Sequence, residues 1–264
     1  MDSTDLTANL YFAATVRVAA DLSLTRLLPL DALKEPLSPH GSFSQRILLS
    51  LQALGVIEPE LSASNAADWL TAHDWIDLGL ETLAWRICWA PRDCRDRHDV
   101  ARELLRTIDP SDDTLEGLLT IWEDLAAAEV AQFTSWTLAR SGYNPHWVQT
   151  AFANIRQSLK TFSVSQVMYL VSISLRSVAT THLQGGVASS QLGHVLADSL
   201  GSFSRRAVVE RWTIRGLSRP AELPISTIVQ IFAHEVSKLD DEYLTKAPSI
   251  AALLEAMTRV RSVH

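Results

Sequence analysis

Residues 161–182, TFSVSQVMYLVSISLRSVATTH, have the pattern of one long buried helix. Ser163 is a favourable N-cap, and Gln166 follows three residues later, which is the spacing of a capping box. Apolar side chains then recur every three or four residues, as on a helix face that packs into a core. These positions are Val164, Val167, Met168, Val171, Leu175 and Val178. The stretch therefore predicts the central helix of an all-α domain.

Most of the remaining sequence has the same helical spacing, interrupted by glycine and proline. The sequence contains neither strand-like alternation nor an internal repeat. We therefore expect an all-α fold, a multi-helix bundle of about 10–13 helices with essentially no sheet. The other expected helices cover 5–22, 42–54, 65–70, 74–89, 100–108, 111–141, 144–159, 188–200, 203–214, 227–239 and 250–260.

The composition is that of a globular chain, with 47% hydrophobic and 20% charged residues. No apolar run reaches the roughly 18 residues that a membrane-spanning helix needs. The first residues lack the basic and apolar regions of a signal peptide. Cys88 and Cys94 are expected to be free thiols, because a zinc site usually needs four Cys or His ligands at close spacing. We therefore expect a cytoplasmic protein that binds no membrane, metal or cofactor.

Acidic and basic residues are unevenly distributed along the chain. Residues 1–132 contain 22 Asp and Glu against 10 Lys and Arg, a net charge of −12, whereas residues 133–264 contain 8 against 13, a net charge of +5. We expect an acidic N-terminal helical region over 1–110 and a C-terminal helical bundle over 111–264, packed as one compact unit. The opposite charges either neutralise each other within the molecule or attract an external partner, and the sequence leaves both open.

The stretch from 24 to 62 has the outline of a winged-helix segment that binds DNA. A short helix, a turn, a capped helix and an apolar exit from that helix follow each other along the chain. Ser44, Gln45 and Arg46 would be the residues that face the bases. The surrounding region is acidic, whereas contact with phosphate needs Lys and Arg, so a capped core helix is the alternative.

The acidic residues near the start of the predicted helix 111–141 are the candidate face for a protein partner. Acidic side chains there also suit the positive end of the helix dipole, and this structural role is the alternative to binding. Exposed tryptophans beside them would serve as anchors, because Trp is enriched at protein interfaces. The candidate residues are Asp109, Asp112, Asp113, Glu116, Trp122, Glu123 and Asp124.

A second candidate surface is basic and lies on and after the predicted helix 203–214. Its residues are Arg205, Arg206, Arg211, Arg215 and Arg219. These arginines would contact an anion, nucleic acid or a protein partner, or they would pair with acidic helices of the same chain.

The sequence motifs of catalysis are not found. His234-Glu235 lacks the second histidine of the zinc-binding motif His-Glu-x-x-His, and the chain has neither the phosphate-binding loop Gly-x-x-x-x-Gly-Lys-Ser/Thr nor a Gly-x-Ser-x-Gly elbow. We therefore expect no enzyme and no catalytic residues. The alternative is a site of residues that meet only in the folded chain, near His234 and Glu235.

The C-terminal half contains a set of short motifs in a fixed order. They are SVSQVMYLV at 163–171, Arg176, Ala179, ERWTI at 210–214, Arg219-Pro220 and LPIS at 223–226. With these motifs, roughly residues 120–245 resemble a group of uncharacterised all-helical bacterial proteins. The resemblance implies a bacterial origin and an all-helical fold, and it implies no activity and no functional residues.

The function expected from these features is the binding of another protein. An acidic, helical, cytoplasmic chain without catalytic motifs suits an immunity protein, or antitoxin, that neutralises a basic toxin by blocking its active site through an acidic face. The alternative is a regulator that binds nucleic acid through the segment 24–62 or the arginines between 205 and 219.

Overall fold

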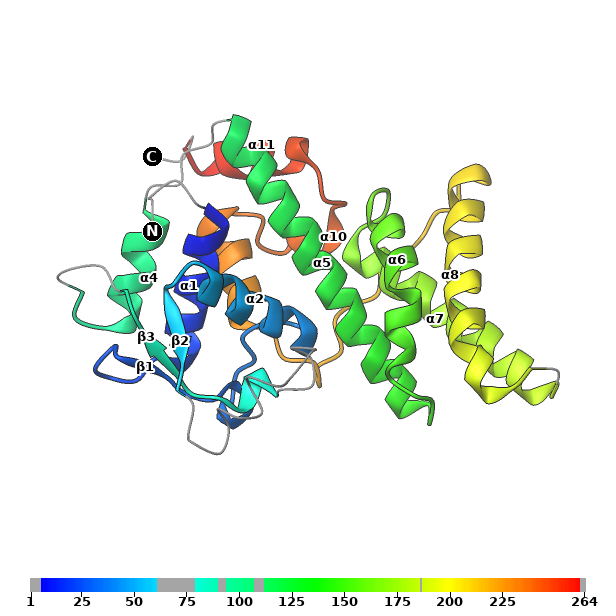
Figure 1. The fold of residues 1–264 in the computed structure, drawn as a ribbon. Helices are drawn as coiled ribbons and strands as arrows, with labels where there is room; N and C mark the ends of the chain where they lie inside the picture. Colours follow the sequence, from blue (N-terminus) through cyan, green and yellow to red (C-terminus); the bar gives the residue numbers. More distant parts are fainter. Residues whose placement is uncertain (1–5, 61–78, 90–93, 107–111, 186, 262–264) are drawn as a thin grey trace. The chain divides into compact units, whose positions relative to one another are not determined.

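The computed structural model describes residues 6–60, 79–89, 94–106, 112–185 and 187–261, and it is mostly helical (Figure 1). The all-α prediction is confirmed, with one small sheet in addition. The chain divides into two compact units, which is a different division from the predicted boundary near 110. Unit 1 comprises residues 1–118 and 224–238, and unit 2 comprises residues 119–223 and 239–264.

Unit 1 contains helices and the three strands of the sheet. Its elements are α1 (Leu6–Ala19), β1 (Arg26–Leu27), η1 (Leu30–Ala32), α2 (Gly41–Ala53), β2 (Ile57–Pro59), η3 (Leu80–Thr82), β3 (Trp85–Ile87), α4 (Arg97–Leu105), the start of α5 (Asp112–Arg140), α9 (Thr227–Gln230) and the π-helical turn η5 (Ile231–Val236). Helix α1 is at its centre, with α2, α4, α9 and η5 packed against it. Leu10, Phe12 and Ala13 of α1 have no exposed surface, which explains why α1 is apolar nearly all round.

The sheet of unit 1 is antiparallel, with the strand order β1-β3-β2. Trp85 of the middle strand opposes Leu27 on one side and Pro59 on the other, and it is almost fully buried. The helix predicted over 74–89 is therefore wrong in its described part, 79–89. Strands of two or three residues are too short to show alternation, so the apolar spacing of this stretch fits a helix equally well.

The segment from Pro224 to Lys238 belongs to unit 1, although it follows most of unit 2 in the sequence. The amide of Thr227 donates to the carbonyl of Pro36 at 3.0 Å, and the amide of Ile228 donates to the carbonyl of Leu37 at 3.1 Å. Ile228, Val229 and Phe232 are buried. This segment is therefore part of the core of unit 1, although the sequence suggested a C-terminal bundle that included it.

Unit 2 is built from long helices. It contains most of α5, together with α6 (Trp147–Leu159), α7 (Val164–Leu183), η4 (Ser189–Gln191), α8 (Leu192–Val209), α10 (Glu242–Thr245) and α11 (Ile250–Arg261). The predicted central helix is α7, and its capping box is confirmed. The Gln166 amide donates to Ser163 Oγ at 3.3 Å, and the Ser163 amide donates to Gln166 Oε1 at 3.0 Å. This cap fixes where α7 begins.

Helices α6 and α8 run side by side in the same direction within unit 2. Asn154 Nδ2 donates to the Ala197 carbonyl at 2.8 Å, and one turn later the hydroxyls of Ser158 and Ser204 are 2.7 Å apart. The break expected between the predicted helices 188–200 and 203–214 is wrong, because α8 continues through Gly201 and ends at Val209. A Cβ on Gly201 would lie 3.2 Å from Asn154 Oδ1, so the glycine allows the two helices to approach closely.

None of the helices in the described ranges has both the length and the apolar character needed to cross a lipid bilayer.

Candidate functional site

The predicted acidic face is divided between the two units. Asp109 and the side chain of Asp112 lie outside the described residues. Asp113 and Glu116 are exposed on the first turns of α5, in unit 1. Glu123 and Asp124 belong to unit 2, where they are partly exposed. Asp124 accepts from Arg156 Nη1 of α6 at 2.6 Å, so this carboxylate already has an intramolecular partner.

Trp122 is not the surface anchor that the sequence suggested. Its side chain has no exposed area, and its ring stacks with that of Tyr243 of α10, with centroids 6.4 Å apart. The indole nitrogen Nε1 has no hydrogen-bond partner among the described residues. A Trp on the inner face of α5 fills the core of unit 2, and the spacing of the sequence alone does not distinguish this role from an anchor.

The predicted base-facing residues of the segment 24–62 lie at the start of α2. Ser44 is buried and exchanges a hydrogen bond with Ser38 at 2.8 Å, so it faces inward and its predicted role is wrong. Gln45 is half-buried and Arg46 is exposed. The Arg46 guanidinium lies 4.3 Å from the centre of the Phe43 ring.

The first turn of α2 has a carboxylate beside it. A Cβ on Gly41 would lie 3.0 Å from Glu81 Oε1, which places the side chain of Glu81 against the positive end of the α2 dipole. Burial, with a smaller effect of the nearby Asp31, raises the pKa of Glu81. The place where a recognition helix would bind phosphate is therefore occupied by an acidic side chain.

The predicted basic set separates into one largely buried arginine and four exposed arginines. Arg219 forms an ion pair with Glu129 of α5, and the side chain of Glu129 is completely buried. Arg219 therefore belongs to the interior of unit 2, which corrects its assignment to a basic surface. Arg205, Arg206 and Arg211 are exposed at the end of α8, and Arg215 is exposed in the segment that follows.

The ion pair of Glu129 and Arg219 lies close to a buried tyrosine. Burial raises the pKa of Glu129, although the Arg219 guanidinium acts in the opposite direction. Burial also raises the pKa of Tyr243 well above its ordinary value, and the negative charge of Glu129 adds to this effect. Arg219 Nε and Nη1 have no hydrogen-bond partner among the described residues. These groups tie α5, α10 and the segment 215–223 together within unit 2.

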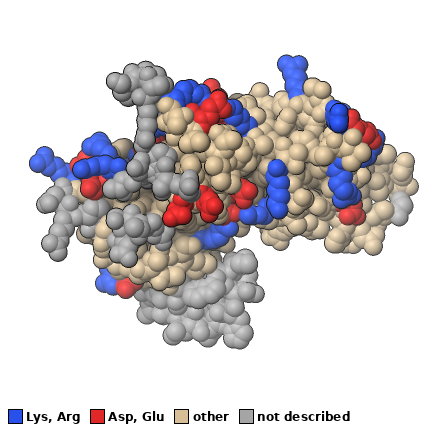
Figure 2. All heavy atoms as spheres, turned by 90° about the horizontal axis from the view of Figure 1, so that it is seen from above, with Lys and Arg blue, Asp and Glu red and all other residues tan. Residues whose placement is uncertain are grey.

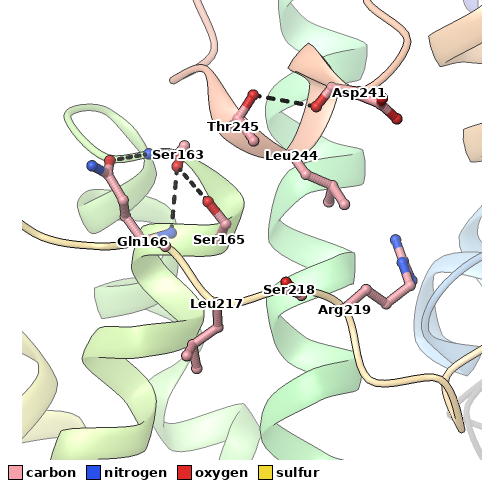
Figure 3. A pocket seen from close by; sticks show the side chains of 10 residues that line it. Ser163, Ser165, Gln166, Leu217, Ser218, Arg219, Asp241, Leu244 and Thr245 are labelled. Carbon is pink, nitrogen blue, oxygen red and sulfur yellow. Dashed lines mark hydrogen bonds between the residues drawn. The ribbon is translucent and has the colours of Figure 1, made fainter.

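A pocket of about 410 Å³ opens beside this ion pair in unit 2 (Figure 3). In Figure 3, Ser163, Ser165 and Gln166 at the start of α7 lie on one side, and Asp241, just before α10, and Thr245, at the end of α10, lie above. Most of the hydroxyls already take part in hydrogen bonds within the chain, such as the 3.0 Å contact between Ser163 and Ser165. The pocket places one carboxylate and one arginine among small hydroxyl groups, without a nucleophile paired to a base.

His234 and Glu235, the basis of the enzyme alternative, lie on the π-helical turn η5 of unit 1. Both guanidinium nitrogens Nη1 and Nη2 of Arg17 donate to the Glu235 carboxylate, the second at 2.9 Å. The hydrogen bond from Arg17 lowers the pKa of Glu235. A carboxylate held by a bidentate arginine is a weak base, so its geometry is that of a structural ion pair between α1 and η5.

Two features of these surfaces could not be recognised in the sequence. The pair of Glu129 and Arg219 joins residues 90 positions apart, and no sequence motif contains both of them. The contact of Glu81 with the start of α2 joins two segments that are separated by residues 61–78. The sequence pointed to both regions, but no signal in it paired Glu129 with Arg219 or Glu81 with the start of α2.

Comparison of the chain with models of protein families, with curated proteins and with solved structures finds no match. The resemblance of residues 120–245 to a bacterial group therefore stays a prediction, and the function is argued from the structure.

Proposed function

We propose that this chain binds a basic protein partner through unit 1 and catalyses no reaction. The observation that carries the proposal is the charge of the units. Unit 1 has 20 acidic and 11 basic residues, a net charge of −9, whereas unit 2 has 10 acidic and 12 basic residues, a net charge of +2. An acidic unit of this kind accelerates and orients association with a basic partner. An immunity protein that covers the active site of a basic toxin is the most concrete form of this proposal.

The order of elements in unit 1 also supports a binding role. Helix α1, strand β1, helix α2 and strands β2 and β3 follow each other, with the strand order β1-β3-β2, as in a winged helix. A winged helix that binds DNA needs basic residues around its second long helix. Here that helix starts beside Glu81, and Arg46 is its one basic residue. The arrangement therefore favours a protein partner over DNA for unit 1, and this argument rests on fold analogy.

The exposed carboxylates at the start of α5 are the part of unit 1 at which we place the contact. Asp113 and Glu116 are exposed and three residues apart, so they share one face of the helix. Neither is needed for the core, since the buried residues of this turn are Leu115 and Leu118. A basic partner can therefore approach both carboxylates without disturbing the packing of α5.

The proposal is tested by capture of partners from the lysate of the source cell, with the wild-type chain and the variant Asp113→Lys/Glu116→Lys as baits. The captured protein is then titrated against both by calorimetry. We expect a basic protein whose dissociation constant rises at least about tenfold in the variant and at higher salt. The control Asp198→Lys/Glu222→Lys makes the same charge change on exposed positions of unit 2. Equal binding by the two variants, or capture of no basic protein, would contradict the proposal.

A further inference from the structure

The end of α8 in unit 2 carries a group of exposed arginines, which we name the arginine end and define as Arg205, Arg206, Arg211 and Arg215. Of these, Arg206 is paired within the chain. Its Nε donates to Glu210 Oε1 at 3.1 Å, and its guanidinium lies 5.3 Å from the centre of the Trp212 ring. The other oxygen of Glu210 accepts from Trp212 Nε1 at 2.7 Å. Glu210, the one carboxylate between 205 and 215, therefore pairs with Arg206 and Trp212 and not with the other three arginines.

The remaining three arginines differ from most others in unit 2. Arg140, Arg156 and Arg259 each form an ion pair with a carboxylate. In the part of the chain that the structure describes, Arg205, Arg211 and Arg215 form none. Figure 2 shows that Lys and Arg gather in small groups on the face in view, with wide uncharged areas between them. Three unpaired arginines within eleven residues therefore make a local surplus of positive charge in a molecule whose net charge is −7.

The backbone at Arg211 is in an unfavourable conformation for this residue. Helix α8 ends in a Schellman motif, in which the Trp212 amide donates to the Ala207 carbonyl at 2.9 Å and the Arg211 amide donates to the Val208 carbonyl at 3.3 Å. The residue at this position of the motif has a positive φ, here 52°, and glycine is strongly preferred there. The helix dipole can explain arginines in the last turn of α8, but it does not explain an arginine at this strained position.

Arg215 is held in place by the segment around it. The Ile214 carbonyl accepts from Gln166 Nε2 at 3.2 Å, and the Leu217 amide donates to the Ser165 carbonyl at 2.9 Å. Gly216 lies directly on Ser165. The backbone on both sides of Arg215 is therefore fastened to the first turn of α7, and the Arg215 side chain is exposed.

From these contacts we propose that the arginine end of unit 2 binds the phosphate backbone of nucleic acid. Guanidinium groups bind phosphate in a planar, bidentate manner, which favours Arg over Lys at such sites, and all four basic residues here are Arg. Trp212, a half-buried aromatic side chain, lies in the same stretch of sequence and contacts Arg206. This site lies in unit 2 and is independent of the protein-binding role proposed for unit 1.

The test is fluorescence anisotropy of the full chain with a labelled 20-nucleotide single strand and with the 20-base-pair duplex, between 50 and 200 mM NaCl. Three phosphate contacts predict a slope of log K against log salt of about −2.7 for the duplex and about −2.1 for the single strand. Arg205→Gln and Arg215→Gln should each reduce the slope by about one contact. Arg176→Gln is the matched control, because Arg176 is exposed on α7, forms no ion pair with any residue that the structure describes and lies about 18 Å from the start of that helix.

The variant Arg211→Gly separates binding from folding. It removes a phosphate contact, and it also relieves the positive φ, so we expect weaker binding together with a melting temperature that is higher by about 2–4 °C. Absence of binding at 50 mM NaCl, an effect of Arg176→Gln equal to that of Arg215→Gln, or tighter binding of polyglutamate than of either nucleic acid would overturn the proposal. Loss of the protein partner of unit 1 leaves these measurements unaffected.

Discussion

For the buried pair of Glu129 and Arg219, the loss of one partner is expected to cost more stability than the loss of a surface charge. Exposed ion pairs such as that of Arg102 and Asp99 contribute about 0–1 kcal/mol each. A buried pair also contributes little by itself, since removing two charges from water offsets their attraction. Removal of one partner is different, because it leaves the other as an uncompensated buried charge.

We therefore expect Arg219→Met to destabilise unit 2 by about 3–5 kcal/mol at pH 7. Burial already raises the pKa of Glu129 above its ordinary 4.5, and without Arg219 nothing opposes this effect. A group with a raised pKa in the folded state favours folding at low pH and loses that contribution as the pH rises through the folded pKa. The loss should thus be smaller at pH 5 than at pH 7 in urea unfolding.

The double variant Glu129→Leu/Arg219→Met is the control for this prediction. It replaces both charges by apolar groups, so it should recover most of the stability and lose the pH dependence. Arg176→Met, at an exposed position, should change the free energy of unfolding by less than about 0.5 kcal/mol. A double variant as unstable as Arg219→Met would show that the charges are not the cause.

At the scale of elements, the close contact of Gly216 with the start of α7 fixes the segment after α8. A Cβ on Gly216 would lie 2.3 Å from Ser165 Oγ, so Gly216→Ala must move the segment and break its hydrogen bond to the Ser165 carbonyl. We expect a loss of about 1–3 kcal/mol in the stability of unit 2, measured by urea unfolding. Nucleic-acid binding should weaken as well, because Arg215 moves with the segment.

Gly117→Ala is the contrasting control for Gly216→Ala. Gly117 lies inside α5, and its nearest neighbour, Leu6 Cδ2, would be 3.4 Å from the new Cβ, which is ordinary contact. Alanine inside a helix is favoured over glycine by about 0.5–1 kcal/mol, so this variant should be neutral or more stable. If Gly216→Ala behaved in the same way, the segment would not be held as the structure indicates.

The long helices were predictable from the sequence because local signals and packing agree there. Ser163 and Gln166 define the start of α7, and the proline and glycine around α5 and α6 bound those helices in the predicted places. Prediction failed where tertiary contacts decide. Trp85 lies in a strand because β1 and β2 pair with β3 on either side. Gly201 lies inside a helix, where Asn154 of α6 packs against it. Neither partner is visible in the local sequence.

For the candidate sites, the sequence predicted which charged residues lie at the surface, but not which residues are buried by contacts with distant elements. Asp113, Glu116, Arg205, Arg211 and Arg215 are exposed, as a surface role requires. Trp122 and Arg219 were wrongly assigned to the surface, because their burial depends on contacts that the local sequence does not show. A periodic pattern places a residue on a helix face, but whether that face points to the core or to solvent depends on elements far away in the sequence. Arg219 is buried because it meets Glu129, and no local pattern shows this pairing.

At the scale of the molecule, the structure predicts that a change near the C-terminus affects the N-terminal helix. Phe232 has no exposed surface and lies in the segment that packs on α1. We expect Phe232→Ala to destabilise unit 1 by about 3–5 kcal/mol. Hydrogen exchange should then accelerate at the amides of α1, while those of α6 to α8 keep their protection. Uniform acceleration in both units would show that they do not unfold separately.

The return of residues 224–238 to unit 1 has a consequence for biosynthesis. A ribosome delivers the chain from its N-terminus at about 5–20 residues per second, so α1 emerges long before the segment that covers it. Until Ile228 and Phe232 leave the exit tunnel, the nascent part of unit 1 leaves apolar surface of α1 uncovered. Unit 1 cannot complete its folding before residues 224–238 are synthesised, so during this interval chaperones that recognise exposed apolar segments have a binding site that the folded unit lacks.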